Sequence, residues 1–238
     1  MHRAKGLFIT GTDTGVGKTR VTAILAVALR QRGLRVGVMK PVESGCLVEN
    51  GQLLAQDSHF LRQISGCTAP PEIITPYMFR EPLAPAIAAQ HAGQEIDLDH
   101  IAYCYEMLAA EHDIVLVEGA GGLLVPLTRQ QNFLDLAARL NLPILVIARN
   151  VLGTINHTAL TVIVASQRCQ VLGIILNTVT AEVQDASQAS NAEALRIWGR
   201  APLLGMLPYN SELTPESLLE QSENIDLSII LEGCSIGS

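Results

Sequence analysis

The sequence contains few aromatic residues and few charged residues. Only 4% of its 238 residues are aromatic and 16% are charged, whereas 48% are hydrophobic. Such a composition excludes a disordered chain and predicts a core built from aliphatic side chains. At this length we expect one domain spanning residues 1–238.

Basic residues are scarce, since 16 Lys and Arg stand against 23 Asp and Glu, for a formal net charge of −7. Proteins that bind nucleic acids or anionic membranes generally present a basic face. We therefore expect no nucleic-acid partner and no membrane partner. A small phosphate ligand stays possible, because one site needs no more than a few local cations.

Targeting and redox features are also absent. No apolar run reaches the roughly 18 residues of a membrane-spanning helix, and no signal-peptide hydrophobic stretch precedes the first expected strand. The five cysteines are widely spaced and include no Cys-x-x-Cys pair. This pattern excludes a disulfide framework and a zinc site, and it fits a reducing compartment. We expect a cytoplasmic protein.

Short apolar runs alternate with segments of helical periodicity along most of the chain. We expect strands at residues 6–10, 35–39, 113–118, 143–147, 171–177 and 203–207. We expect helices at residues 19–32, 58–65, 98–111, 133–140, 155–168 and 189–198. Several strands are apolar without alternation, which is typical of strands covered on both faces. The pattern predicts an α/β fold with a doubly wound, mostly parallel sheet.

Two segments are less regular. Residues 67–85 hold five of the eleven prolines, and a loop of that length in a compact domain is often a binding element. Residues 227–231 are apolar, and the pattern leaves open whether they add an edge strand or fray.

A glycine-rich segment, residues 11–19 (GTDTGVGKT), lies between the first expected strand and the first expected helix. Glycines allow backbone N–H groups to surround phosphates, and the helix N-terminus favours negative charge. Lys18 would contact the β- and γ-phosphates and the Thr19 hydroxyl would ligate Mg²⁺. The usual spacing places a glycine where Thr12 stands, and here the glycine comes one residue earlier. The context nevertheless predicts a nucleotide-binding fold of the P-loop NTPase type.

Candidate metal and phosphate residues follow other strands. Glu118 ends an apolar run and precedes Gly119, so we expect it at the carboxyl edge of the sheet, facing the phosphates rather than solvent. Asp57 is either a second metal ligand or the N-cap of the following helix. Lys40 ends another strand and is either a solvated charge or a second cation on the phosphates, with Ser44 nearby.

Taken together, these motifs resemble the dethiobiotin synthetase family. The matching strings are spread over most of the chain in the family's order: GTDT with VGKT, KPV with SG, VEGAGG, the residues Pro76, Tyr77, Phe79, Glu81, Pro82 and Pro85, then LG with INH, and Asn177. The longer glycine spacing is also found in that family. The resemblance implies that the chain combines 7,8-diaminononanoate with CO₂ and MgATP to give dethiobiotin, ADP and phosphate. It implies a carbamate and a carbamic–phosphoric anhydride as intermediates.

The resemblance also assigns roles to individual residues. It implies that Lys18 and Lys40 are catalytic and that Thr19, Asp57 and Glu118 hold Mg²⁺, which favours the metal interpretation of Asp57. The implied nucleotide contacts are Asp13, Thr14, Gly15, Val16, Gly17, Lys18, Thr19, Asn177 and Pro208. The implied substrate contacts are Lys40, Ser44, Gly153, Thr154, Ile155 and Asn156.

Residues 153–156 would act across a homodimer interface and cap the substrate carboxylate of the other subunit. Backbone N–H groups that open a helix form such an anion site, although the same turn alone would be an ordinary N-cap with Thr154 as the capping residue. The chain departs from the family at Gly15, where an acidic side chain is frequent. Residues 191–194 also lack an aromatic residue that some members place near the substrate carboxylate.

The competing hypothesis is a nucleotide-dependent switch of the partitioning-ATPase type. Those ATPases carry an additional lysine early in the loop, where this chain has Thr12 and Asp13. An inactive regulatory module is disfavoured because Lys18, Thr19, Lys40 and Glu118 are all present. The amidating synthetases that share the loop carry a glutaminase domain, for which 238 residues leave no room.

Overall fold

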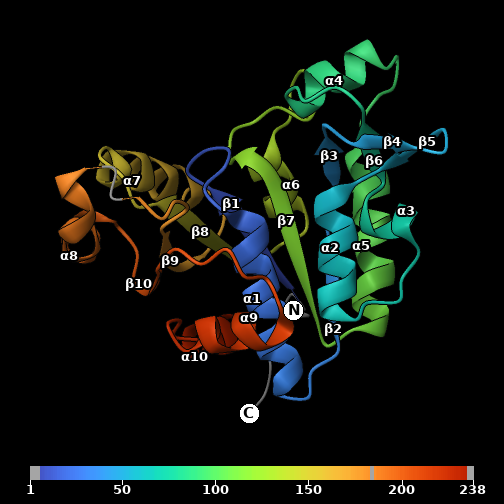
Figure 1. The fold of residues 1–238 in the computed structure, drawn as a ribbon. Helices are drawn as coiled ribbons and strands as arrows, with labels where there is room; N and C mark the ends of the chain where they lie inside the picture. Colours follow the sequence, from blue (N-terminus) through green and yellow to red (C-terminus); the bar gives the residue numbers. More distant parts are fainter. Residues whose placement is uncertain (1–5, 183–184, 235–238) are drawn as a thin grey trace.

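The computed structural model describes residues 6–182 and 185–234 (Figure 1). Its centre is a six-stranded sheet in which every neighbouring pair is parallel, in the order β10-β9-β8-β1-β7-β2. These strands are β1 (Gly6–Gly11), β2 (Val36–Met39), β7 (Ile114–Gly122), β8 (Ile144–Arg149), β9 (Val171–Asn177) and β10 (Leu203–Leu207). The predicted α/β class and parallel sheet are confirmed.

Helices cover both faces of this sheet, and α9 packs against α1 (Figure 1). The helices are α1 (Lys18–Gln31), α2 (Gln56–Ser65), α3 (Pro71–Ile74), α4 (Pro85–His91), α5 (Leu98–Glu111), α6 (Phe133–Arg139), α7 (Thr154–Ala165), the 3₁₀ helix η1 (Ala186–Ala189), α8 (Asn191–Trp198), α9 (Pro215–Ser222) and α10 (Ser228–Gly233). Local sequence sets several boundaries. Asp97 caps α5 by accepting the N–H of Asp99, and Asn132 with Asp135 forms a capping box on α6.

The core is aliphatic, as the composition predicts. All six residues of β1 are buried, and α1 buries an apolar stripe against the sheet. The largest fully buried side chains are Phe8, Phe79 and Phe133, and Phe8 packs against Phe133 at 6.3 Å between centroids. Because helices cover both sides, the central strands carry apolar residues in succession rather than in alternation.

Strand β1 lies between β7 and β8. Strands that follow β1 are added to the sheet on both sides of it, so β1 marks the point where the strand order reverses. In open parallel sheets, ligands bind at this reversal, outside the carboxyl ends of the strands. The loop after β1 and helix α4 both lie beyond that edge (Figure 1). The topology therefore places a binding crevice next to the glycine-rich loop.

The irregular segment 67–85 is more ordered than the sequence suggests. It contains α3 and the strand β6 (Tyr77–Phe79), which pairs in parallel with β3 (Val42–Ser44). A separate hairpin joins β4 (Leu47–Glu49) to β5 (Gln52–Leu54). These three-residue strands are too short to produce a periodic signal in the sequence.

Residues 227–231 are neither an edge strand nor a frayed end, because α10 begins at Ser228. Leu227, Ile230 and Cys234 are buried, and their spacing of three and four residues is helical. Asp226 accepts the N–H of Ser228 and so satisfies one donor at the helix start. None of the helices in the described part of the chain combines the length and the apolar composition that a membrane crossing needs.

Candidate functional site

A cavity of about 730 Å³ lies at the carboxyl edge of the sheet. Its volume falls in the range of small-molecule sites. Ten of the residues expected in the site line it: Thr14, Gly15, Gly17, Lys18, Thr19, Lys40, Ser44, Asp57, Glu118 and Asn177. These residues come from α1, α2, β3, β7, β9 and the connecting loops. The fold thus brings together residues as distant in sequence as Thr14 and Asn177, which are 163 positions apart.

The loop between β1 and α1 has a backbone that only glycine adopts readily. Gly15 (φ 71°) and Gly17 (φ 88°) both lie in the left-handed region, and Gly17 is the N-cap of α1. The amide of Asn177 packs directly on Gly17, so a Cβ added there would lie 2.1 Å from Asn177 Nδ2. Asn177 Nδ2 donates to the carbonyl of Val16 at 2.8 Å and so ties the loop to the end of β9.

Lys18 is the first residue of α1, and its side chain is buried at the cavity wall. Its Nζ donates to the carbonyl of Asp13 at 3.3 Å, which holds the ammonium over the loop. Burial lowers the pKa of Lys18, Glu118 opposes this effect, and the charge of Lys40 adds to it. An anionic phosphate in the loop would relieve the cost of keeping this ammonium charged.

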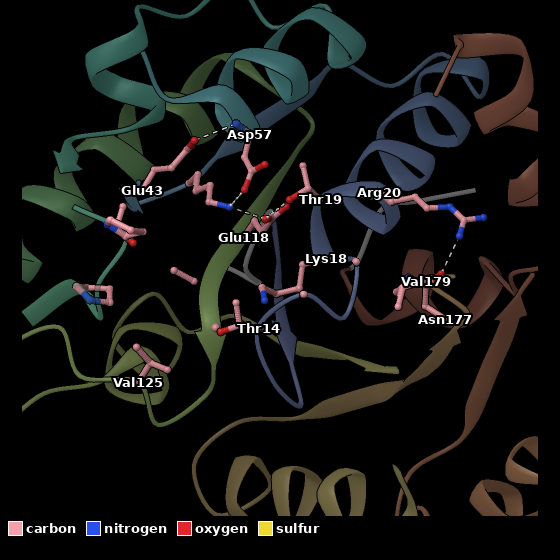
Figure 2. A pocket seen from close by; sticks show the side chains of 18 of the residues that line it. Thr14, Lys18, Thr19, Arg20, Glu43, Asp57, Glu118, Val125, Asn177 and Val179 are labelled. Atoms are coloured by element: carbon pink, nitrogen blue, oxygen red, sulfur yellow. Dashed lines mark hydrogen bonds and ion pairs between the residues drawn. The ribbon is translucent and has the colours of Figure 1, made fainter. Parts of the chain in front are cut away.

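Glu118 is the centre of a buried cluster of hydrogen bonds (Figure 2). Its carboxylate has no exposed surface and accepts hydrogen bonds from Thr19 Oγ1 at 2.8 Å and Lys40 Nζ at 2.8 Å. Thr22 Oγ1 lies 2.9 Å from the other carboxylate oxygen. Lys40 Nζ also donates to Asp57 Oδ2 at 2.5 Å. The ammonium of Lys40 therefore bridges the two carboxylates expected to ligate a metal ion.

This pairing decides between the two interpretations of Lys40. The residue is 5% exposed, which excludes a solvated surface charge. Burial by itself disfavours the charged form, but the carboxylates of Glu118 and Asp57 raise the pKa of Lys40 above its ordinary value. The two carboxylates therefore favour the charged form of Lys40.

Two alternative capping interpretations are wrong. Helix α2 begins at Gln56 with Ala55 as its N-cap, so Asp57 is inside the first turn and does not cap the helix. Helix α7 has Gly153 as its N-cap, and Thr154 is its first helical residue. Glycine takes the cap position of α7 because the backbone there has a φ of 94°.

Several expected site residues lie outside the cavity lining of a single chain. These are Asp13, Val16, Pro208, Gly153, Thr154, Ile155 and Asn156. Asp13 and Val16 belong to the loop itself and contribute backbone carbonyls to Lys18 and Asn177. The carbonyl of Pro208 accepts a hydrogen bond from Arg20, which borders the cavity.

Similarity to known proteins covers nearly the whole chain. The profile of a family described as "AAA domain" matches residues 5–217. The ATP-dependent dethiobiotin synthetase BioD of Anaeromyxobacter sp. (strain K) is 46% identical over 210 residues, which are 88% of this chain and 92% of that protein. The protein of the same name from Thermodesulfovibrio yellowstonii is 37% identical over 95% of this chain and 98% of its own length.

The chain belongs to the dethiobiotin synthetase family. The resemblance found in the motifs is thereby confirmed, as is its implication of an ATP-dependent ligase.

Solved structures show a wider relationship in fold. A ParA family ATPase from Chlorobium tepidum matches with a TM-score of 0.56 and 14% identity, covering 97% of this chain and 98% of that one. The septum site-determining protein MinD of Pyrococcus horikoshii, solved with Mg-ADP, matches with a TM-score of 0.56, 18% identity and coverage of 91% and 86%. Identities this low show a shared fold, so they give the partitioning-type alternative no advantage over the synthetase family.

Arg20 is a site residue that the sequence did not reveal. It follows Thr19 on α1, and its guanidinium donates to Asn177 Oδ1 at 3.0 Å (Figure 2). It also donates to the carbonyl of Pro208 at 2.8 Å and to Gln221 Oε1 at 2.9 Å. It thus joins α1 to the end of β9, the loop after β10 and α9. With Asn177 Nδ2 bound to Val16, both ends of the Asn177 amide are engaged, and the network fixes its orientation. All these partners are more than 150 positions away, so no local pattern could have indicated them.

Proposed function

We propose that this cavity binds ATP together with 7,8-diaminononanoate and catalyses ring closure with CO₂ to dethiobiotin, with residues 1–238 acting as one synthetase domain. The observation that carries the proposal is the burial of two lysines, Lys18 and Lys40, on one cavity at the end of a glycine-rich loop. Transfer of a phosphoryl group to an anionic acceptor needs such cations, because negative charge spreads over the phosphoryl oxygens in the transition state.

The proposed reaction has three steps. One amine of the substrate adds to CO₂ and loses a proton, which gives a carbamate. A carbamate oxygen then attacks the γ-phosphorus of ATP, and the bond to ADP breaks, which gives a carbamic–phosphoric anhydride. The second amine attacks the carbamoyl carbon, phosphate leaves with its bridging oxygen, and the amine loses a proton as the cyclic urea closes.

Each lysine has a separate task in these steps. Lys18 lies over the loop and neutralises the β- and γ-phosphates of ATP. Lys40 and Ser44 line the same cavity on the carbamate side, and the carboxylates of Glu118 and Asp57 raise the pKa of Lys40. Lys40 brings the anionic carbamate to the γ-phosphate and stabilises the transferred charge.

The residues around Lys40 also fit Mg²⁺. Thr19, Asp57 and Glu118 offer two carboxylates and a hydroxyl, which are the hard oxygen donors that Mg²⁺ requires. No group of three or more His, Cys, Asp or Glu side chains within residues 6–182 and 185–234 could hold a metal by itself. A bound Mg²⁺ would accordingly complete its shell with phosphate oxygens, as Mg²⁺ sites with nucleotides do, and would neutralise phosphate charge there.

A homodimer would complete the site. At the start of helix α7 the N–H of Thr154 donates to the carbonyl of Val151 and that of His157 to the carbonyl of Gly153. This leaves the N–H groups of Ile155 and Asn156 for the substrate carboxylate. This turn does not line the cavity of its own chain. The same helix carries exposed Leu160 and Ile163, one turn apart. Burying this face against a second copy would bring the turn to the neighbouring cavity.

Replacing Leu160 and Ile163 together by aspartate should therefore dissociate the dimer. We expect the wild-type protein to have about twice the 25.5 kDa of one chain in light scattering, and the double variant to be monomeric. The monomer should still bind ADP but form no dethiobiotin. Tyr103 and Met107 are an equally exposed pair on α5 and provide the matched control, since aspartates there should leave the dimer intact. A monomeric wild-type protein with full activity would contradict the dimer.

The proposed reaction is tested by phosphate release from MgATP in the presence of bicarbonate, with and without 7,8-diaminononanoate. We expect turnover to depend on the diamine, with one phosphate released for each dethiobiotin. ATP hydrolysis that is indifferent to the diamine would favour a nucleotide-dependent switch instead.

A further inference from the structure

Glu43 is a buried acid in β3 that has no part in the reaction as described. It is 6% exposed, and both of its carboxylate oxygens are engaged by backbone donors. The N–H of Asp57 donates to Oε1 at 2.9 Å (Figure 2), and the N–H of Ser58 donates to Oε2 at 3.1 Å. A carboxylate from one strand is thus bound to the first turn of a helix 14 residues further along the chain.

This contact replaces a missing helix cap. The N-cap residue of α2 is Ala55, whose side chain has no acceptor, and the first N–H groups of any helix lack partners within the helix. Glu43 satisfies two of them with charge-assisted hydrogen bonds and places negative charge at the positive end of the helix dipole. Glu43 therefore ties the first turn of α2 to β3.

The first turn of α2 carries Asp57. Its side chain is 46% exposed, and the hydrogen bond from Lys40 is directed to one of its oxygens. Because nearly half of the Asp57 side chain is exposed, few neighbouring atoms restrain it. The position of its carboxylate in the site therefore follows the position of its backbone. Glu43 binds that backbone at the N–H of Asp57 itself.

We propose that Glu43 is a positioning residue that holds Asp57 against Lys40 and the nucleotide-bound metal ion. The proposal rests on the function proposed above, in which Asp57 is a metal ligand. What matters is that Glu43 reaches both N–H groups with one carboxylate oxygen each.

Two conservative variants test this contact. Glu43→Gln keeps the length and one acceptor oxygen, but it removes the charge and the second acceptor, whereas Glu43→Asp keeps the charge and both oxygens and is one methylene too short to reach. The readout is the affinity of the ADP-loaded full-length protein for Mn²⁺, measured by the EPR signal of free Mn²⁺. Groups that orient metal ligands typically contribute 10–100-fold to metal affinity. We expect Glu43→Asp to weaken Mn²⁺ binding at least about 10-fold and Glu43→Gln, which keeps one of the two hydrogen bonds, to weaken it by about 3-fold.

Controls distinguish this role from general helix capping. Asp97→Ala removes a carboxylate cap from α5, far along the chain, and should lower the melting temperature without changing Mn²⁺ affinity. If Glu43→Gln binds Mn²⁺ no better than Glu43→Asp, the proposal is overturned. Asp57→Asn tests the underlying assignment: unchanged Mn²⁺ affinity in that variant would remove Asp57 from the metal site, whereas a loss there with a normal Glu43→Asp would refute the positioning role alone.

Discussion

Replacing Lys40 by alanine is expected to lower dethiobiotin formation at least about 100-fold at saturating ATP. Lys40 supplies the cation on the carbamate side of the cavity, and its loss removes charge stabilisation from the transition state. The variant also leaves Glu118 fully buried, with its hydroxyl partners but without its ion pair. Breaking a buried ion pair in this way costs about 3–5 kcal/mol of folding free energy, so the melting temperature should fall as well.

Activity and folding can be separated in this variant. ADP binding, measured by calorimetry, should persist because Lys18 and the loop are untouched, which shows that the protein is folded. Arg35 provides the matched control: it lies at the other end of β2, where it forms an exposed ion pair with Asp113. Arg35→Ala should leave turnover unchanged. A Lys40→Ala enzyme with a near-normal rate would remove Lys40 from the catalytic residues and leave it a buried structural cation.

Replacing Gly17 by alanine should nearly abolish nucleotide binding. The left-handed backbone at Gly17 costs an alanine about 1–2 kcal/mol, and the new Cβ would lie 2.1 Å from Asn177 Nδ2. Asn177 cannot yield without breaking its hydrogen bonds to Val16 and Arg20. We expect the dissociation constant of ADP with Mg²⁺, measured by calorimetry, to rise more than about 100-fold, since each 1.4 kcal/mol is a factor of ten.

A second variant, Gly15→Ala, separates the effect of backbone strain in this loop from the effect of a steric clash. The φ of 71° at Gly15 imposes a similar backbone strain, but an added Cβ there meets no heavy atom within 4 Å. Gly15→Ala should therefore weaken ADP binding about 10-fold, from strain alone. If Gly17→Ala and Gly15→Ala weakened binding equally, the packing of Asn177 on the loop would not matter for the nucleotide.

The sequence predicted the larger elements well because their signals are local. Helix α5 has the predicted bounds, since Asp97 caps its start and its apolar residues repeat with helical spacing. The strands of the main sheet were found because burial on both faces makes each of them a continuous apolar run. Strand β7 extends to Gly122, beyond the predicted end, because its glycines continue the pairing with β1 as far as Gly11.

The small elements could not be predicted because tertiary contacts determine them. Strand β6 has three residues and exists through its pairing with β3, more than 30 positions earlier. The segment 227–231 became helical because Ile230 and Cys234 are buried together with Leu227, a choice that depends on the surface beneath it.

The residues of the candidate site also divide into those that local sequence predicts and those that tertiary contacts determine. The glycine-rich loop, Lys18, Thr19 and Glu118 were located from spacing and from their position at strand ends. The bridging of Asp57 and Glu118 by Lys40, and the roles of Glu43 and Arg20, depend on side-chain contacts between distant segments. A single sequence carries no record of such contacts, and an arginine or glutamate in these positions resembles any surface charge.

The most direct test of the proposed reaction follows the oxygen atoms. When the enzyme turns over MgATP and 7,8-diaminononanoate with ¹⁸O-labelled bicarbonate, freshly mixed, the attack of the carbamate oxygen on the γ-phosphorus predicts one labelled oxygen in the released phosphate. The phosphate should appear in equal amount with dethiobiotin and should be absent without the diamine. Unlabelled phosphate, or phosphate released equally without the diamine, would contradict the carbamic–phosphoric anhydride and with it the proposed role of the two lysines.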